Sequence, residues 1–147
     1  MRARGWGRIA FGLGGGHAAV SAYWAFGGTA GLATVGGELA RWAREHSPAA
    51  AGALAGIAAV KLLVAALGPV VALGPNRVVR GLAGAAAVVL IGYGGVLTAG
   101  QALVAVGVVP ASPQLDRTAF YGHLLLWDPW FLLWGLALWA AVRTSRR

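Results

Sequence analysis

The sequence contains no cysteine. Disulfide bonds, thiolate catalysis, iron–sulfur clusters and cysteine-ligated zinc are therefore excluded. Charged residues are also scarce: they make up 11% of the 147 residues, against about 25% in soluble domains. So few charges cannot give a domain of this size a polar shell. Together with a hydrophobic fraction of 59%, this composition predicts a single domain embedded in a membrane.

Acidic residues are scarcer still, with four against twelve basic residues and a net charge of +8. A basic excess can indicate nucleic-acid binding. Here the arginines lie in short clusters between apolar runs rather than on one basic face, so we exclude nucleic acid as a partner. Lysine occurs only at Lys61, within an apolar run.

Four apolar runs are long enough to cross the hydrocarbon layer, which takes about 20 helical residues. They cover approximately residues 9–32, 49–73, 78–109 and 119–142. Ser47 and Pro48 are typical of the cap and first turn of a helix, and Gly-Pro-Asn at residues 74–76 predicts a tight turn. We therefore predict an all-α, four-helix transmembrane bundle that forms one domain over residues 1–147.

The arginines predict the orientation of this bundle. Eight fall on one side of the four-span arrangement: Arg2, Arg4, Arg8, Arg77, Arg80, Arg143, Arg146 and Arg147. The three arginines on the other side are offset by three carboxylates. Because the side with the basic excess faces the cytoplasm, both termini are expected inside, most simply in a bacterial plasma membrane.

Two features near the N-terminus bear on this topology. A cleaved signal peptide also fits the N-terminus, which has a basic start, an apolar stretch and Val-Ser-Ala at residues 20–22. The three glycines at 14–16 argue against it, because they interrupt the apolar stretch that such a peptide needs. Residues 38–46, which read ELARWAREH, mix charged and apolar side chains. They predict a short interfacial helix on the outer surface, with Trp42 at headgroup level.

Two charged residues fall inside the predicted spans, where each costs about 3 kcal/mol. Lys61 is expected near the midplane and Asp128 nearer the outside, within reach of a lysine side chain. The simplest interpretation is a buried Lys61–Asp128 ion pair that fixes which helices are neighbours. The alternatives are a proton-linked or substrate-binding site, and a Lys61 that extends alone towards the interface.

Other polar side chains are expected to face the same centre. His17, Ser21 and Trp24 share one face of the first helix, at spacings of four and three residues. Tyr93 lies near the middle of the third helix. The predicted polar centre consists of His17, Ser21, Trp24, Lys61, Tyr93 and Asp128. A packing role is the plainer interpretation of the histidine.

Small and aromatic residues suggest how the helices pack. Three glycine pairs have the spacing that allows close helix approach: Gly12 with Gly16, Gly27 with Gly31, and Gly52 with Gly56. Trp127, Trp130 and Trp134 should share one face, with Asp128 roughly opposite. Pro129 should bend its helix just after Asp128.

Cofactor signatures are missing from the sequence. There is no zinc motif, phosphate-binding glycine loop or Ser-His-Asp arrangement. His17 and His123 are expected at different depths, which argues against a haem held by two histidines. We predict no cofactor and no metal.

Two segments are distinctive: residues 23–28, which read YWAFGG, and residues 126–133, which read LWDPWFLL. With the chain length and four spans, they resemble an uncharacterised family of small bacterial integral membrane proteins, a domain of unknown function. The resemblance implies a four-helix membrane fold and marks Asp128 as a family feature. It implies no activity, cofactor or substrate.

From these residues we expect a noncatalytic protein of the lipid bilayer, whose polar centre stabilises the bundle or binds a small amphipathic ligand. One alternative is a small transporter or proton-linked permease, acting as a homo-oligomer through Asp128 and Lys61. Another is a membrane enzyme that acts on a lipid or isoprenoid, with His17 or Asp128 as proton donor. A third is a partner subunit of a larger membrane protein complex.

Overall fold

The computed structural model describes residues 2–45, 47–74 and 76–145. All regular elements in these ranges are helical: α1 (Ala3–Ala25), α2 (Leu32–Val35), α3 (Gly37–Glu45), α4 (Pro48–Ala72), α5 (Arg77–Ala105), α6 (Arg117–Gly122), the π-helical turn η1 (His123–Trp127) and α7 (Asp128–Thr144). His46, Pro75, Arg146 and Arg147, which enter the predictions above, lie outside the described residues.

Helix ends follow local capping chemistry. Ser47 accepts a hydrogen bond from the Ala50 backbone N–H at 3.1 Å, which confirms the predicted cap of α4. Asn76 caps α5 in the same way, accepting from the N–H of Val79 at 3.0 Å. α4, α5 and the continuous stretch α6–η1–α7 therefore begin and end within a few residues of the predicted runs.

The first helix is displaced from its prediction. It covers residues 3–25 instead of 9–32. Gly27 and Gly31 follow it with φ angles of 89° and 79°, a left-handed conformation that glycine adopts without steric cost. These two glycines therefore form a turn, and the predicted Gly27–Gly31 helix-packing pair is wrong.

Three helical stretches among the described residues are long and apolar enough to cross a membrane: Pro48–Ala72, Arg77–Ala105 and Arg117–Thr144. α1 has 23 residues but is not one of them. His17, Ser21 and two arginines lower its hydropathy. Length and composition thus support three of the four expected spans.

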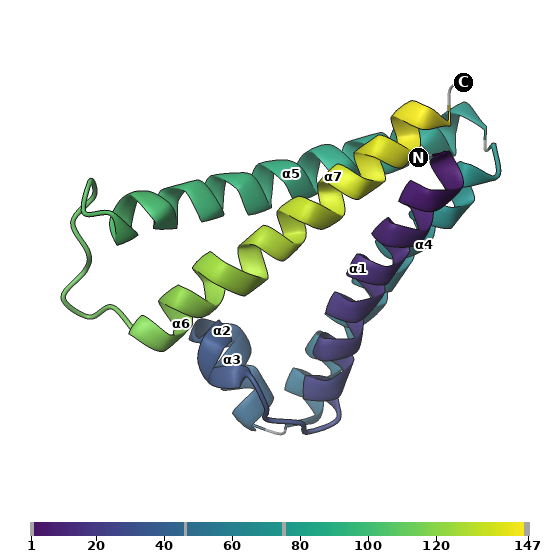
Figure 1. Ribbon diagram of the computed structural model, residues 1–147. Coiled ribbons are helices and arrows are strands. Elements are labelled where there is room, and N and C mark those ends of the chain that lie inside the picture. The colour runs from purple at the N-terminus through teal and green to yellow at the C-terminus, as the bar shows by residue number, and fades with distance from the viewer. Residues whose placement is uncertain (1, 46, 75, 146–147) are drawn as a thin grey trace.

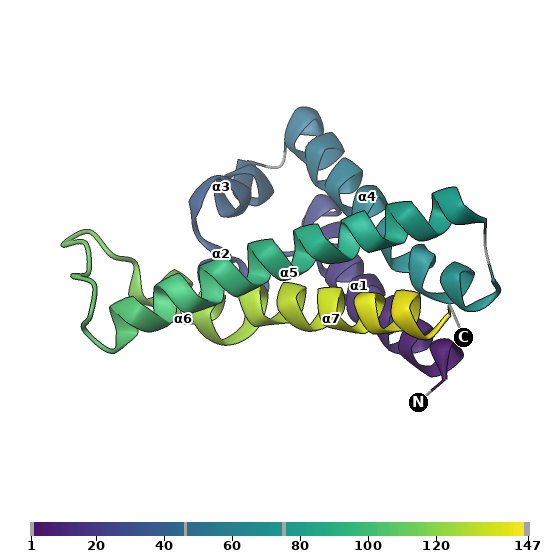
Figure 2. The ribbon, with the colours of Figure 1, turned by 90° about the horizontal axis from the view of Figure 1, so that it is seen from above.

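The long helices form two antiparallel pairs, α1 with α4 and α5 with α7 (Figure 1). α1 also packs against α7, which joins the pairs. The pairs meet at the end that holds both termini and the α4–α5 connection, and they diverge towards the other end, where α2 and α3 lie (Figure 1 and Figure 2). The two joined helix pairs form an open V, and the four-helix transmembrane bundle stays a prediction.

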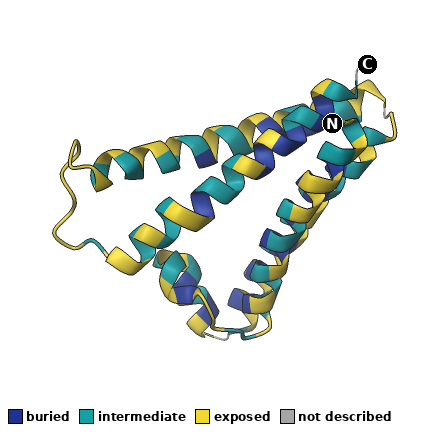
Figure 3. Cartoon of the chain, viewed as in Figure 1, coloured by how far each residue is buried: buried dark blue, intermediate teal, exposed yellow. Residues whose placement is uncertain are grey.

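Buried apolar residues form two clusters, on the faces that the helices turn towards one another (Figure 3). The cluster at the closed end of the V includes Val71, Trp134 and Leu138. The cluster at the open end includes Trp24 and Trp127. Apolar packing thus holds the V together at both ends.

The closest helix contacts use glycines other than the predicted pairs. A Cβ added to Gly7 would lie 2.4 Å from the carbonyl oxygen of Gly68, where α1 meets α4. A Cβ added to Gly94 would lie 2.4 Å from the backbone nitrogen of Leu132, where α5 meets α7. Open space surrounds the predicted contact positions Gly12, Gly52 and Gly56. The glycine pair predicted within α4 is therefore wrong. Of the pair predicted within α1, only Gly16 meets a neighbour, since a Cβ added to it would lie 3.0 Å from the ring of Trp130 in α7.

Candidate functional site

A partly open cavity of about 370 Å³ lies between the two helix pairs. Its lining comes from α1, α2, α3, α4, α5, η1 and α7, and from Gly36 between α2 and α3. It brings together five residues of the predicted polar centre: His17, Trp24, Lys61, Tyr93 and Asp128. The sixth, Ser21, is fully buried beside the cavity and contacts Lys61.

Lys61 bonds to two polar groups of α1. Its ammonium donates to Ser21 Oγ at 2.8 Å and lies 3.1 Å from His17 Nδ1. The Ser21 hydroxyl donates to the carbonyl of His17 at 3.3 Å. Because an ammonium can only donate, His17 Nδ1 accepts and the imidazole proton sits on Nε2. His17 Nε2 is buried and has no hydrogen-bond partner among the described residues.

Aromatic rings of η1 and α7 surround this polar group. The His17 ring lies 4.3 Å from Phe131, 5.2 Å from Trp130 and 5.6 Å from Trp127, measured between centroids. The Lys61 ammonium lies 5.6 Å from the Phe131 centroid, within the range of a cation–π interaction. One wall of the cavity is therefore aromatic, and it contacts both polar side chains.

Asp128 is 1% exposed and has its own partners. Its Oδ2 accepts from Gln101 Nε2 at 2.7 Å, and its Oδ1 lies 3.2 Å from His123 Nδ1. His123 Nε2 lies 2.9 Å from the carbonyl of Val35. A carbonyl only accepts, so this nitrogen carries a proton.

A second proton must then lie between His123 Nδ1 and Asp128 Oδ1, since two lone pairs would otherwise face each other at 3.2 Å. The pair is either an imidazolium with a carboxylate or a neutral imidazole with a carboxylic acid. Its net charge is zero in both forms.

The predicted Lys61–Asp128 ion pair is therefore wrong. Lys61 bonds to α1, whereas Asp128 bonds to η1 and α5, and the described residues show no ion pair between them. Both line the same cavity, so their predicted proximity to one polar centre agrees with the structure.

Sequence reasoning did not place His123, the partner of Asp128, in the polar centre. It lies five residues before Asp128, which on an α-helix is a separation of about 140°. In η1 the Asp128 N–H donates to the His123 carbonyl, five residues back, and this wider turn brings the two side chains together. Pro129, which lacks a backbone N–H, was the available signal of an irregular turn. The irregularity precedes Asp128, although we predicted a bend after it.

Trp127 of η1 and Trp130 of α7 attach this segment to other helices. Trp127 Nε1 donates to the Thr34 carbonyl at 3.1 Å, and Trp130 Nε1 donates to the Leu13 carbonyl at 2.9 Å. Asp128 bonds instead to Gln101 of α5 and to His123 of η1. This division agrees with the predicted placement of the tryptophans and Asp128 on different faces.

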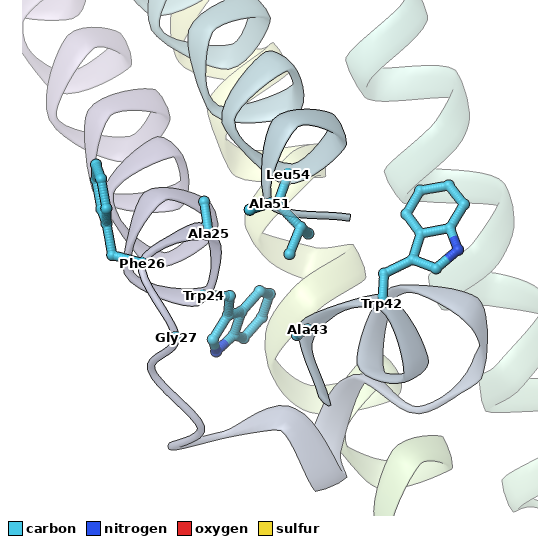
Figure 4. Close-up of a pocket in the computed structure, with 8 residues that line it drawn as sticks. All are labelled: Trp24, Ala25, Phe26, Gly27, Trp42, Ala43, Ala51 and Leu54. Atoms are coloured by element: carbon cyan, nitrogen blue, oxygen red, sulfur yellow. The ribbon is translucent and has the colours of Figure 1, made fainter. Parts of the chain in front are cut away.

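A second cavity, of about 270 Å³, lies where the end of α1 meets α3 and α4 (Figure 4). No charged side chain lines it. Trp24 lines both cavities, and its indole N–H is already bonded to the Ala30 carbonyl at 2.9 Å. Of these two cavities, the first combines charged groups with an apolar wall and the second does not.

These features define an all-helical protein with three helices that are suited to membrane spans, and with a polar, aromatic-walled cavity between its helix pairs. The described residues contain no group of three potential metal ligands. The chain belongs to the family described as protein of unknown function (DUF3995), whose model matches residues 14–138. This match confirms the predicted resemblance to a family of unknown function. No curated protein and no solved structure matches the chain.

Proposed function

We propose that this protein spans a bacterial plasma membrane four times and binds a small amphipathic ligand in the 370 Å³ cavity. The cavity carries the proposal, because it joins a polar group, Lys61 with His17, to an aromatic wall. Its volume lies within the range of about 300–1,000 Å³ that is typical of small-molecule sites. Binding of this kind requires no catalytic step.

The geometry of α1 supports its role as the fourth span. Its 23 residues give a length of about 35 Å, enough to cross the hydrocarbon layer. Its polar residues His17 and Ser21 turn towards Lys61 of α4, and both are buried. The mean hydropathy of α1 therefore understates how apolar its remaining surface is.

The arginines support an arrangement with both termini inside. The start of α1, the start of α5 and the end of α7 all lie at the closed end of the V (Figure 1). These helix ends carry six arginines of the described chain: Arg2, Arg4, Arg8, Arg77, Arg80 and Arg143. By the positive-inside rule this end is cytoplasmic. The cavity, α2 and α3 then lie towards the outer side.

The lack of cysteine makes this topology directly testable. Ser112→Cys, in the α5–α6 connection, is expected to react with a membrane-impermeant maleimide added to intact cells. Ser145→Cys, at the end of α7, is expected to react only after the cells are permeabilised. Equal labelling of both variants in intact cells would contradict the proposed topology.

Ligand binding is tested by native mass spectrometry of protein released from its own membrane in mild detergent. We expect one retained small molecule per chain. Leu39→Trp, at the cavity lining, should displace it, whereas Leu63→Trp, at an exposed position of α4, should not. A wild-type protein without any bound mass would contradict the proposal.

A proton-linked transporter is the second candidate, and the proton shared by His123 and Asp128 beside the cavity favours it. So small a transporter is expected to act as a homo-oligomer. Vesicles that contain the reconstituted protein and a trapped pH-sensitive dye should then acidify or alkalinise when the retained ligand is added. If the protein is a strict monomer and the ligand binds without any change of pH inside the vesicles, the transporter is rejected and ligand binding remains the proposed function.

A further inference from the structure

The charges that face the cavity do not cancel. Its titratable lining consists of His17, Glu38, Lys61, Tyr93, His123 and Asp128. The His123–Asp128 pair holds one shared proton and is neutral overall. Glu38 is exposed at the edge of the cavity and is paired with Arg41.

The remaining charge belongs to Lys61. Its two polar partners, His17 Nδ1 and Ser21 Oγ, are neutral acceptors. No carboxylate of the described chain forms an ion pair with it. The cavity thus contains one positive charge without a negative partner, and such a charge in an apolar setting calls for a counter-ion.

Two hydrogen-bond donors at this site also have no acceptor among the described residues: His17 Nε2–H and one proton of the Lys61 ammonium. His17 is 4% exposed, and its Nε2–H has no partner among the described residues. The Lys61 ammonium has three protons, and its contacts in the described chain supply one nitrogen and one oxygen acceptor. Both donors belong to residues that line the cavity.

We propose that the ligand is a single-chain amphiphile with a carboxylate headgroup, bound by Lys61 and His17. This inference rests on the proposed ligand-binding function. A carboxylate brings one negative charge, which matches the one uncompensated positive charge. Its two oxygens only accept hydrogen bonds, which matches the two open donors. The hydrocarbon chain of the ligand packs against the aromatic wall formed by Trp127 and Phe131.

Other headgroups fit these features less well. A phosphate monoester carries a charge of about −1.5 to −2 and would leave negative charge in the cavity. An alcohol would leave the Lys61 charge unmatched, and a quaternary ammonium would be repelled by it. A singly charged, acceptor-only headgroup satisfies both the charge and the donors.

The test compares four C12 probes that share a tail: dodecanoate, dodecyl phosphate, dodecanol and dodecyltrimethylammonium. Each is added to the full-length protein in mild non-ionic detergent, and occupancy is measured by native mass spectrometry. A charge-assisted hydrogen bond predicts that dodecanoate binds at least about tenfold more tightly than dodecanol. Lys61→Met should remove this preference, whereas Lys61→Arg and the exposed control Leu63→Met should keep it.

Each outcome is decisive. A dodecanoate preference that depends on the charge at residue 61 supports the inference. Equal binding of all four probes, or tightest binding of the phosphate or the ammonium, overturns the carboxylate assignment but retains the ligand-binding function. No binding of any probe, together with no retained ligand from the native membrane, overturns the proposed function itself. Because the headgroup comparison is made on the wild-type chain, it stands even if Lys61→Met fails to fold.

Discussion

Removing Asp128 tests the contacts around the cavity most directly. Asp128→Ala leaves the amide of Gln101 and the imidazole of His123 without their partner. A buried polar group without a partner costs about 1–3 kcal/mol. The His123 side chain is 31% exposed, so water compensates part of its loss. We expect Asp128→Ala to lower the free energy of unfolding by about 3 kcal/mol.

Two double-mutant cycles then separate the observed contact from the one that the sequence suggested. His123→Ala combined with Asp128→Ala should give a coupling energy of about 1–2 kcal/mol, because these residues are bonded at 3.2 Å. Lys61→Met combined with Asp128→Ala should give less than about 0.5 kcal/mol, because these residues share no bond.

The assay is equilibrium unfolding in mixed micelles, followed by circular dichroism, with all variants in one detergent. The Lys61–Asp128 cycle serves as the internal control, since it removes the same carboxylate and a charge that lines the same cavity. A larger coupling in the Lys61–Asp128 cycle than in the His123–Asp128 cycle would refute the assignment of partners.

Two further predictions concern packing and surface charge. Gly94→Ala should destabilise the protein by about 1–3 kcal/mol, because the added methyl group meets the backbone of α7, whereas Gly52→Ala, in open space, should be neutral or stabilising in the same unfolding assay. The hydrogen bond from Arg41 holds the pKa of Glu38 below its usual range, so this pair should stabilise α3 at neutral pH and lose that effect as the pH falls through the lowered pKa. The check is the protection of the α3 amides against exchange, taken relative to their intrinsic exchange rates at each pH, with Glu38→Gln as the insensitive control. Protection that stays constant through acid pH would contradict the prediction.

Periodicity and capping were sufficient to predict several parts of this molecule. Long apolar runs fixed the approximate positions of α4, α5 and α7. Ser47 marked the start of α4 through a cap that depends only on neighbouring residues. His17, Ser21 and Trp24 were placed on one buried face by helical spacing alone. These features are local, so the sequence carries them directly.

Other features depend on how helices meet, and local patterns did not predict them. Asp128 was predicted to pair with Lys61 because it was the carboxylate closest to Lys61 in membrane depth. Depth does not determine the partner, however, since packing sets the direction in which each side chain points. Lys61 turns to Ser21, and Gly94 rather than a spaced glycine pair forms the α5–α7 contact. Spacing identifies which residues share a face but not which other helix that face contacts.

The His123–Asp128 contact is an intermediate case, because a local cause produces a contact that regular periodicity hides. A proline at 129 cannot donate to the carbonyl of Leu125, so the α-helical pattern is already broken there, and η1 uses the wider π-helical turn. Pro129→Ala restores the missing donor. We expect it to return residues 123–127 to α-helical geometry, to rotate His123 away from Asp128 and to reduce their coupling energy below about 0.5 kcal/mol in the same double-mutant cycle. The helix itself should become more stable, because an internal proline costs about 3 kcal/mol relative to alanine where it interrupts an α-helix. If the coupling stays at about 1–2 kcal/mol in the Pro129→Ala background, tertiary contacts such as the bond from His123 to Val35 must hold the turn, and the proline is not its cause.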